Sequence, residues 1–448
     1  MKRDLTKGSV TGSLLIFAGP MILGNLLQQL YNIVDTWVVG KYVGADALAA
    51  VGSAYSLMTF LTSILIGLCM GSGALLSFYF GKGEQGKLRG CMLSSFVMIG
   101  LLALGLNLLV WVLKRPILRF LRIPEELSGL MESYVTVVFA GIFFVFLYNF
   151  FAFVLRAVGN SLMPLVFLGI ASFINVALDF WFVPGLGMGL AGAAWATVAA
   201  QAFSGVGLGI YTWIKEPRFR FSLREFKASE KPLKEILGFS LTTSAQQSVM
   251  NFGILLVQGL VNSFGVSVMA AFAAAVKIDT FAYMPAQEFG NAFSIFVSQN
   301  YGAGEKERLK RGTAGAFALS GLFCLLISAG VWALARYLML VFVKESETEI
   351  LRIGMEYLRI EGAFYIGIGI LFLLYGYFRG VNRPGVSLLL TVISLGTRVI
   401  LAYTLAAIPG IGERGIWWAI PIGWALADIT GILLLRKGSK DTGSRISA

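Results

Sequence analysis

Long apolar runs constrain the fold of this chain more than any other feature of its sequence. A bilayer-spanning helix needs about 20 consecutive, mainly apolar residues. Twelve runs of at least this length follow one another along the 448 residues: near 10–38, 48–79, 91–113, 130–155, 161–183, 188–214, 236–262, 267–299, 312–341, 351–378, 384–408 and 415–436. We therefore predict an all-α polytopic membrane protein with twelve transmembrane helices.

The composition agrees with lipid as the main solvent and excludes several kinds of chemistry. Apolar residues make up 57% of the chain and charged residues only 13%, whereas a soluble domain has about 25% charged residues. Histidine is absent, which excludes His-centred metal sites, Ser-His-Asp catalysis and imidazole proton relays. Cys69, Cys91 and Cys324 lie in apolar stretches without paired spacing, so we expect packing roles and no disulfide.

Two sequence signals of catalysis are also missing. No Gly-x-x-x-x-Gly-Lys-[Ser/Thr] loop occurs, which argues against the use of ATP. A membrane-embedded lipid transferase would need an acid cluster such as Asp-Asp-x-x-Asp, and the sequence has none. We expect a protein that is not an enzyme and that has no cofactor.

The net charge of +12 is distributed as in a membrane protein, so we expect no nucleic-acid partner. Basic residues crowd into short segments between the apolar runs, and with both termini inside, 24 of the 36 Lys and Arg residues lie on the inner side. Such an excess marks the cytoplasmic side. One loop, with Lys114, Arg115, Arg119 and Arg122, falls on the outer side without outweighing the total. We predict a multi-pass protein of the plasma membrane with both termini in the cytoplasm.

The two halves of the chain repeat each other. Residues 80–84 (Phe-Gly-Lys-Gly-Glu) correspond to 301–305 (Tyr-Gly-Ala-Gly-Glu), a shift of 221. Further matches at nearly the same shift pair 44–50 with 265–271, 155–158 with 378–381, and 184–187 with 409–412. Six helices per half preserve orientation, so the halves are parallel repeats, an arrangement common in transporters. We predict two pseudo-symmetric six-helix lobes: an N-lobe (1–214), a cytoplasmic linker (215–235) and a C-lobe (236–448).

Two acids lie deep in the predicted helices. A charged side chain at the bilayer centre costs roughly 2.5–3.5 kcal/mol on insertion scales, so an acid retained there is a functional candidate. Asp35 lies in the first helix and Asp179 in the fifth, where Asn175 precedes it by one turn on the same face. Two carboxylates with amide and hydroxyl oxygens suit a proton or a hard monovalent cation, and if they face each other they cannot easily both ionise. The alternative is that each acid satisfies a helix cap or a buried arginine.

Other intramembrane residues have no assigned role. The further charges are Lys277, Asp279, Glu288, Glu361, Arg398 and Asp428. Lys277 and Asp279 are two residues apart and therefore point to different faces.

Arg156 and Arg379 occupy equivalent repeat positions at helix ends, where snorkelling to lipid headgroups explains them. Pro20 should kink the first helix, as a hinge or as a static bend.

At these residues the sequence resembles the multidrug and toxic compound extrusion (MATE) transporters. The likeness covers nearly the whole chain and includes the duplicated glycine-acid loop, Val34-Asp35-Thr36 with Val39-Gly40, and 156–160 with Pro164. It implies a cation-coupling site, which would bind the metal ion in a sodium-coupled member, formed by Asp35, Asn175, Asp179 and Thr197. It further implies that Pro20 is a hinge and that the N-lobe substrate cavity is lined by Gln28, Tyr31, Tyr134, Asn149 and Gln201.

The resemblance also implies a function. A MATE transporter exports bulky, often cationic, organic compounds by alternating access in exchange for Na⁺ or H⁺, and either ion fits here. One branch of the family relies on an acid in the seventh helix, but 240–262 contains none. The same superfamily includes flippases for lipid-linked saccharides, whose cavities are typically cationic, whereas the cavity candidates here are acidic or neutral. We expect small-molecule drugs and membrane lipid as partners, and a monomeric protein. The sequence does not identify the natural substrate and does not decide between a monomer and a dimer.

Overall fold

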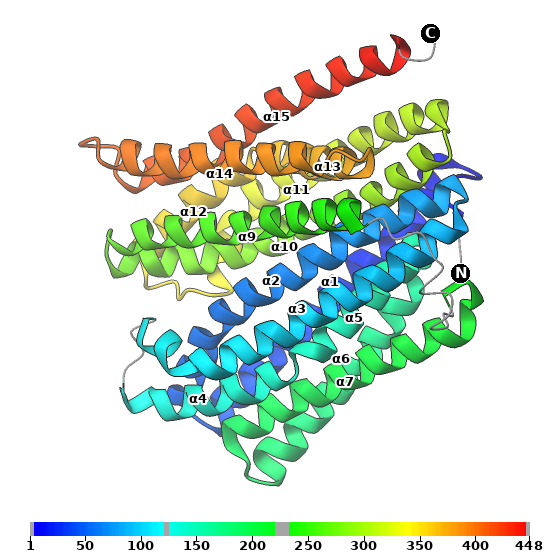
Figure 1. Ribbon diagram of the computed structural model, residues 1–448. Coiled ribbons are helices and arrows are strands. Elements are labelled where there is room, and N and C mark those ends of the chain that lie inside the picture. Colours follow the sequence, from blue (N-terminus) through cyan, green and yellow to red (C-terminus); the bar gives the residue numbers. More distant parts are fainter. Residues whose placement is uncertain (1–3, 121–124, 220–232, 445–448) are drawn as a thin grey trace. The chain divides into compact units, whose positions relative to one another are not determined.

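The fold is all-helical. The computed structural model describes residues 4–120, 125–219 and 233–444, and this part of the chain contains no β-strand (Figure 1). The long helices are α1 (Val10–Tyr42), α2 (Ala45–Lys82), α3 (Gln85–Phe120), α7 (Gly189–Lys215), α9 (Leu233–Asn262), α10 (Val266–Gly302), α11 (Lys306–Leu340), α14 (Pro384–Ala406) and α15 (Glu413–Ser444). The shorter helices are α4 (Glu125–Ala140), α5 (Ile142–Ala157), α6 (Leu162–Phe180), α12 (Thr348–Gly362) and α13 (Tyr365–Gly380). The predicted fold class is confirmed.

Most of the predicted spans have the length and apolar character that a bilayer requires. Nine helices among the described residues meet this requirement, or up to eleven if each bent pair, α4 with α5 and α12 with α13, counts as one span. The bends are 40° and 51°. The seventh predicted span coincides with α9, which is not among the eleven and which carries the polar run 242–248 (Thr-Thr-Ser-Ala-Gln-Gln-Ser).

The internal repeat extends to the backbone. Gly44 and Gly265 precede α2 and α10 with φ of 118° and 97°, and Gly83 and Gly304 follow the same helices closely with φ of 77° and 75°. Each pair is 221 residues apart, as in the sequence repeat. Side chains with a Cβ rarely adopt such φ values, so glycine sets the ends of the corresponding helices in both halves.

A charged loop follows α2. Glu84 forms ion pairs with Lys82, at 2.6 Å, and with Lys87, at 3.1 Å. Hydrogen bonds from these two ammonium groups hold the pKa of Glu84 below its usual range. The loop thus keeps its carboxylate ionised between two lysines.

The chain forms two compact units. Unit 1 contains Met1–Leu5 and Leu15–Ser244, and unit 2 contains Thr6–Leu14 and Ala245–Ala448. The division falls inside α9, while the predicted linker 215–235 lies largely in 220–232, outside the described residues. The start of α9 belongs to unit 1 because it packs closely on α2: a Cβ on Gly67 would lie 2.5 Å from Ser244 Cα, and one on Gly71 would lie 2.5 Å from the carbonyl oxygen of Phe239.

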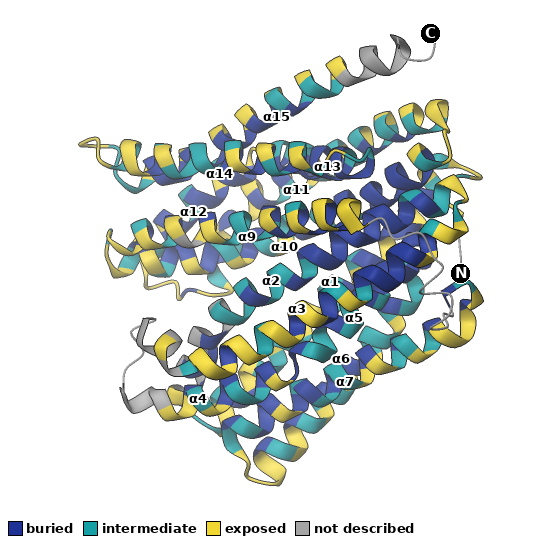
Figure 2. Ribbon diagram, viewed as in Figure 1, coloured by how far each residue is buried: buried dark blue, intermediate teal, exposed yellow. Residues whose placement is uncertain are grey.

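Each unit has its own apolar core (Figure 2). In unit 1, α2 packs against α3, α4 and α5, and α7 packs against α5 and α6. In unit 2, the equivalent helix α10 packs against α11, α12 and α13, and α14 packs against α15. The helix α2 and its repeat counterpart α10 are therefore central to their own units.

The structure corrects the interpretation of Arg379. Its side chain does not snorkel: the residue is 4% exposed, and its guanidinium donates to Ser294 Oγ at 3.0 Å and to Asn291 Oδ1 at 3.1 Å. Asn291 in turn donates to Glu288 Oε1 at 3.3 Å. The arginine ties α13 to α10 because hydrogen-bond acceptors on the neighbouring helix replace water.

Candidate functional site

The last two turns of α6 carry the polar pair predicted from the sequence. Asn175 and Asp179 are 1% and 0% exposed and lie one helical turn apart, on one face. Directly after them the chain forms a short π-helical turn, Trp181–Gly185, which contains Pro184. Such widened turns are frequent at functional sites, and here the turn ends α6 within two residues of the acid.

Helix α1 lies against α6 and brings the second acid. A Cβ on Gly24 would lie 3.5 Å from the Leu168 side chain. Near the other end of α1, the rings of Trp37 and Tyr42 each lie 6.4 Å from the ring of Phe180. These side-chain contacts bring α1 close to α6 in two regions, around Gly24 and around Trp37 and Tyr42. Asp35 lies on α1 between these two contact regions.

The charges of the two acids act on each other. Asp35 lies close enough to Asp179 for the two charges to interact. Both acids also lie close enough to interact electrostatically with the buried hydroxyl of Tyr134. Both carboxylate oxygens of Asp179 and Oδ1 of Asp35 are buried without a hydrogen-bond partner. The alternative interpretation, that each acid satisfies a helix cap or a buried arginine, therefore finds no support at Asp179.

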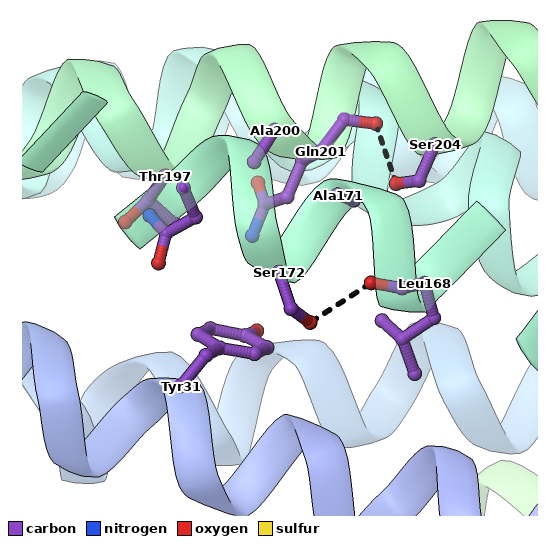
Figure 3. A pocket seen from close by; sticks show the side chains of 9 residues that line it. Tyr31, Leu168, Ala171, Ser172, Thr197, Ala200, Gln201 and Ser204 are labelled. Atoms are coloured by element: carbon purple, nitrogen blue, oxygen red, sulfur yellow. Dashed lines mark hydrogen bonds between the residues drawn. The ribbon is translucent and has the colours of Figure 1, made fainter. Parts of the chain in front are cut away.

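A small cavity is lined by Tyr31 and Asn175, each of which lies one helical turn before one of the acids (Figure 3). Its polar lining comes from α1, α6 and α7: Tyr31, Ser172, Asn175, Thr197, Gln201 and Ser204. Thr197 donates to the Ala193 carbonyl at 3.1 Å, whereas both amide atoms of Asn175 and Oε1 of Gln201 are buried without a partner. Oxygen atoms without partners are thus available on two neighbouring helices.

The volume of the cavity decides what it can hold. It measures about 30 Å³, and a cavity needs only about 10–15 Å³ by this measure to hold a water molecule. It therefore has room for a water molecule or a small cation and is far too small for a drug. Carboxylate, amide and hydroxyl oxygens suit hard cations. The described residues contain no group of three or more His, Cys, Asp or Glu side chains that could hold a metal ion. A sodium ion would need the amide and hydroxyl oxygens beside the acid pair.

The structure brings together most, but not all, of the residues predicted for this site. Tyr31, Asn175, Thr197 and Gln201 line the cavity, and the two acids and Tyr134 adjoin one another as described above. The acids and Tyr134 are not part of the lining. Three further predicted residues belong neither to the lining nor to this group: Gln28, exposed on α1; Asn149, which donates to the carbonyl of Val145 in its own helix at 2.9 Å; and Pro20, inside α1.

Two polar residues of the cavity lining were not predicted. Ser172 donates to the Leu168 carbonyl at 2.8 Å, and Ser204 donates to that of Gln201 at 3.1 Å. The helical period could have identified both. Ser172 lies on the Asn175 face of α6, three residues before it, and Ser204 lies on the face of α7 that carries Gln201 and Thr197.

The charges without an assigned role separate into four groups in unit 2. Lys277 is exposed over the ring of Phe342, at 5.9 Å, and Glu288 belongs to the Arg379 network. Asp279 and Glu361 are 2% and 3% exposed and lie in electrostatic range of Arg398. Asp428 is buried, and its Oδ1 has no hydrogen-bond partner.

Comparisons with known proteins agree in fold and in family. The MatE family model matches residues 20–181 and 243–404. The chain is 30% identical to the probable multidrug resistance protein YpnP of Bacillus subtilis, over 97% of both chains. It is 25% identical to the probable multidrug resistance protein NorM of Thermotoga maritima, over 90% of this chain and 87% of the relative. A crystal structure of MATE in the bent conformation has the same fold, with a TM-score of 0.92 at 23% identity, over 99% of this chain and 98% of that one.

Proposed function

Since the chain belongs to the MatE family, we propose that it is a multidrug exporter that moves bulky, often cationic organic compounds out of the cell in exchange for Na⁺ or H⁺. Its relatives YpnP and NorM are named as probable multidrug resistance proteins, and the chain is a multi-pass membrane protein. One observation carries the coupling mechanism: the carboxylate of Asp179 is fully buried with no hydrogen-bond partner. A buried carboxylate without a partner is costly, so a cation or a proton must relieve it.

The coupling ion exchanges at the acid pair. Uptake of H⁺ or Na⁺ removes one negative charge from the space that Asp35 and Asp179 share. For Na⁺, Asn175 and Thr197 supply the additional oxygen ligands. Binding must favour one arrangement of the transporter over the other, since equal affinity for both would shift no population. Asp35 is on the same helix as Pro20, which has no N–H for the helical ladder, and we assign the change of shape to this point of α1.

The driving force is sufficient for export without ATP. One elementary charge crossing ~100 mV is worth about 2.3 kcal/mol, which corresponds to roughly a fifty-fold concentration ratio of the exported compound. An ion gradient adds to this value. The substrate itself must bind elsewhere, because the cavity beside the acids has room only for a small ion or a water molecule.

The orientation follows from charge. Basic residues are in excess in the segments on one side of the predicted spans, and we assign this side to the cytoplasm. The protein then lies in the inner membrane with both termini in the cytoplasm. One chain carries the complete acid pair, so a monomer is the transport unit.

Proteoliposomes with separately imposed pH and sodium gradients test the proposal. We expect dye efflux to follow one of the two gradients and to be lost in Asp35→Asn. The matched control is Asp46→Asn, which changes an exposed acid in the first turn of α2 and should transport normally. Full transport by Asp35→Asn, or lipid-headgroup flipping without any ion gradient, would contradict the proposal, and the second result would favour a flippase.

A further inference from the structure

Unit 2 carries an arginine on its surface that the proposed function does not use. Arg359 lies in the last turn of α12 and is exposed. Its guanidinium lies over the indole ring of Trp332 on α11, 5.5 Å from the ring centroid. This tryptophan is itself 54% exposed. Two neighbouring helices thus present one cationic and aromatic surface patch, formed by Arg359 and Trp332.

The charge of Arg359 is not neutralised as the charges of nearby arginines are. Three arginines at this end of α11, α12 and α15 are ion-paired with glutamates: Arg336 with Glu345 at 2.7 Å, Arg414 with Glu356 at 2.6 Å, and Arg352 with Glu356 at 3.6 Å. Within the residues that the structure describes, no hydrogen bond or ion pair reaches the guanidinium of Arg359. The patch therefore presents one positive charge to whatever surrounds the protein.

The sequence of α11 gives the depth of the patch in the membrane. Arg311 and Arg336 bound the segment 312–335, which contains no charged residue. As a helix these residues rise about 36 Å, compared with about 30 Å for the hydrocarbon core of a bilayer, so both bounding arginines lie just outside the core. Trp332 lies one turn, about 6 Å, deeper than Arg336. Its ring and Arg359 are therefore at the boundary between hydrocarbon and headgroups.

The chemistry of the patch suits the phosphate group of a lipid. Tryptophan is enriched at this boundary because its ring is amphipathic. An arginine binds phosphate bidentately with its planar fork of donors and can stack on an aromatic ring at the same time. A charge without a counter-charge is costly near the hydrocarbon core. A headgroup with a net negative charge supplies the counter-charge, whereas a zwitterionic headgroup brings its own cation close to the guanidinium.

We propose that Arg359 and Trp332 form a binding site for one anionic phospholipid, whose phosphate pairs with the guanidinium and whose upper acyl chain packs on the indole. The lipid contacts α11 and α12 at once. Arg359 lies three residues before the end of α12, next to the 51° bend between α12 and α13, so the bound lipid holds α12 against α11 beside this bend. The site goes beyond the proposed exchange of drug for ion and does not depend on it.

Quenching of tryptophan fluorescence by lipids with brominated acyl chains tests the site. The full-length protein is reconstituted in vesicles of phosphatidylglycerol, which is anionic, and phosphatidylcholine, which is zwitterionic, with bromine on one lipid at a time. The difference between each protein and its Trp332→Phe version isolates this ring among the nine tryptophans. We expect stronger quenching of Trp332 when the anionic lipid carries the bromine.

Substitutions at the arginines make the result specific. Arg359→Gln should lower the preference of the site for the anionic lipid about ten-fold, which corresponds to about 1.4 kcal/mol. The matched control is Arg352→Gln, which changes an exposed arginine on the same helix that is paired with Glu356 and should keep the preference. If Arg359→Gln does not fold, Arg359→Lys replaces it and should also lower the preference, because an ammonium group lacks the planar fork.

Four results would overturn the proposal. Equal quenching of Trp332 by the two lipids in the wild type would mean that ordinary bilayer lipid surrounds the patch. An undiminished preference in Arg359→Gln would remove the arginine from the site, and an equal loss in Arg352→Gln would mean that only the overall surface charge matters. A dimeric protein whose Trp332 neither lipid quenches would assign the patch to a second copy of the chain.

Discussion

Replacement of Asp179 by asparagine should abolish transport without weakening the fold. Both carboxylate oxygens of Asp179 are buried without hydrogen-bond partners, and the residue is 0% exposed. A buried, unsatisfied polar group costs about 1–3 kcal/mol, and more if it is charged. Asn has nearly the same volume and no charge, so the variant also removes the repulsion from Asp35. The amide of Asn is still a buried polar group, so the substitution removes only the additional cost of the charge. We expect Asp179→Asn to be as stable as the wild type or more stable by about 1 kcal/mol.

The assay combines two measurements on the same preparation. Thermal unfolding in detergent gives the stability, and dye efflux from proteoliposomes under an imposed ion gradient gives the transport. For each charge moved across ~100 mV, the wild type can sustain about a fifty-fold ratio between the dye concentrations on the two sides of the membrane. The variant should reach only equal dye concentrations on both sides. Ser204→Ala, which removes a hydroxyl bonded to a backbone carbonyl in the same cavity, is the matched control and should keep most of the transport.

Either of two results would refute the reasoning. A lower unfolding midpoint for Asp179→Asn would mean that the acid makes a stabilising interaction, so that the loss of transport could be attributed to the damaged fold. Wild-type efflux in the variant would remove Asp179 from the coupling site altogether. A stable variant without transport separates the coupling role of Asp179 from a structural one.

Three further predictions concern the helices. Gly71→Val should destabilise unit 1 by about 1–3 kcal/mol in thermal unfolding, because a Cβ at Gly71 would lie 2.5 Å from a backbone oxygen of α9. The control Gly238→Ala should not destabilise it, because no atom lies within 4 Å of a Cβ at Gly238. Gly83→Ala should lower the free energy of unfolding by about 1–2 kcal/mol, because the φ of Gly83 is 77°. Gly86 is helical and has open space at its Cβ position, so Gly86→Ala should leave the unfolding midpoint nearly unchanged. Equal midpoints for the two variants would contradict the argument. Pro20→Ala should slow efflux without changing the affinity for the coupling ion, since it restores the missing backbone hydrogen bond of α1; unchanged efflux kinetics would exclude the hinge.

Local patterns revealed part of the candidate site. Asn175 and Asp179 share a face of α6 because four residues make about one helical turn, and this relation holds whatever surrounds the helix. The same period would have added Ser172 and Ser204. By contrast, Asn149 bonds to its own helix and Gln28 is exposed, and nothing in the local pattern separates these two from the residues that line the cavity.

The sequence by itself determined the properties that depend on composition and on neighbours along the chain: a helical membrane protein, its repeat, and the glycines that end equivalent helices. Tertiary structure alone decided which helix faces meet. It buried Arg379 against α10 instead of exposing it to headgroups, and it brought the hydroxyls of Tyr357 on α12 and Tyr365 on α13 to the carboxylate of Asp279 on α10. The physical reason is that a buried charge is stable only where particular partners come within hydrogen-bonding distance, and those partners come from segments whose approach no local period encodes.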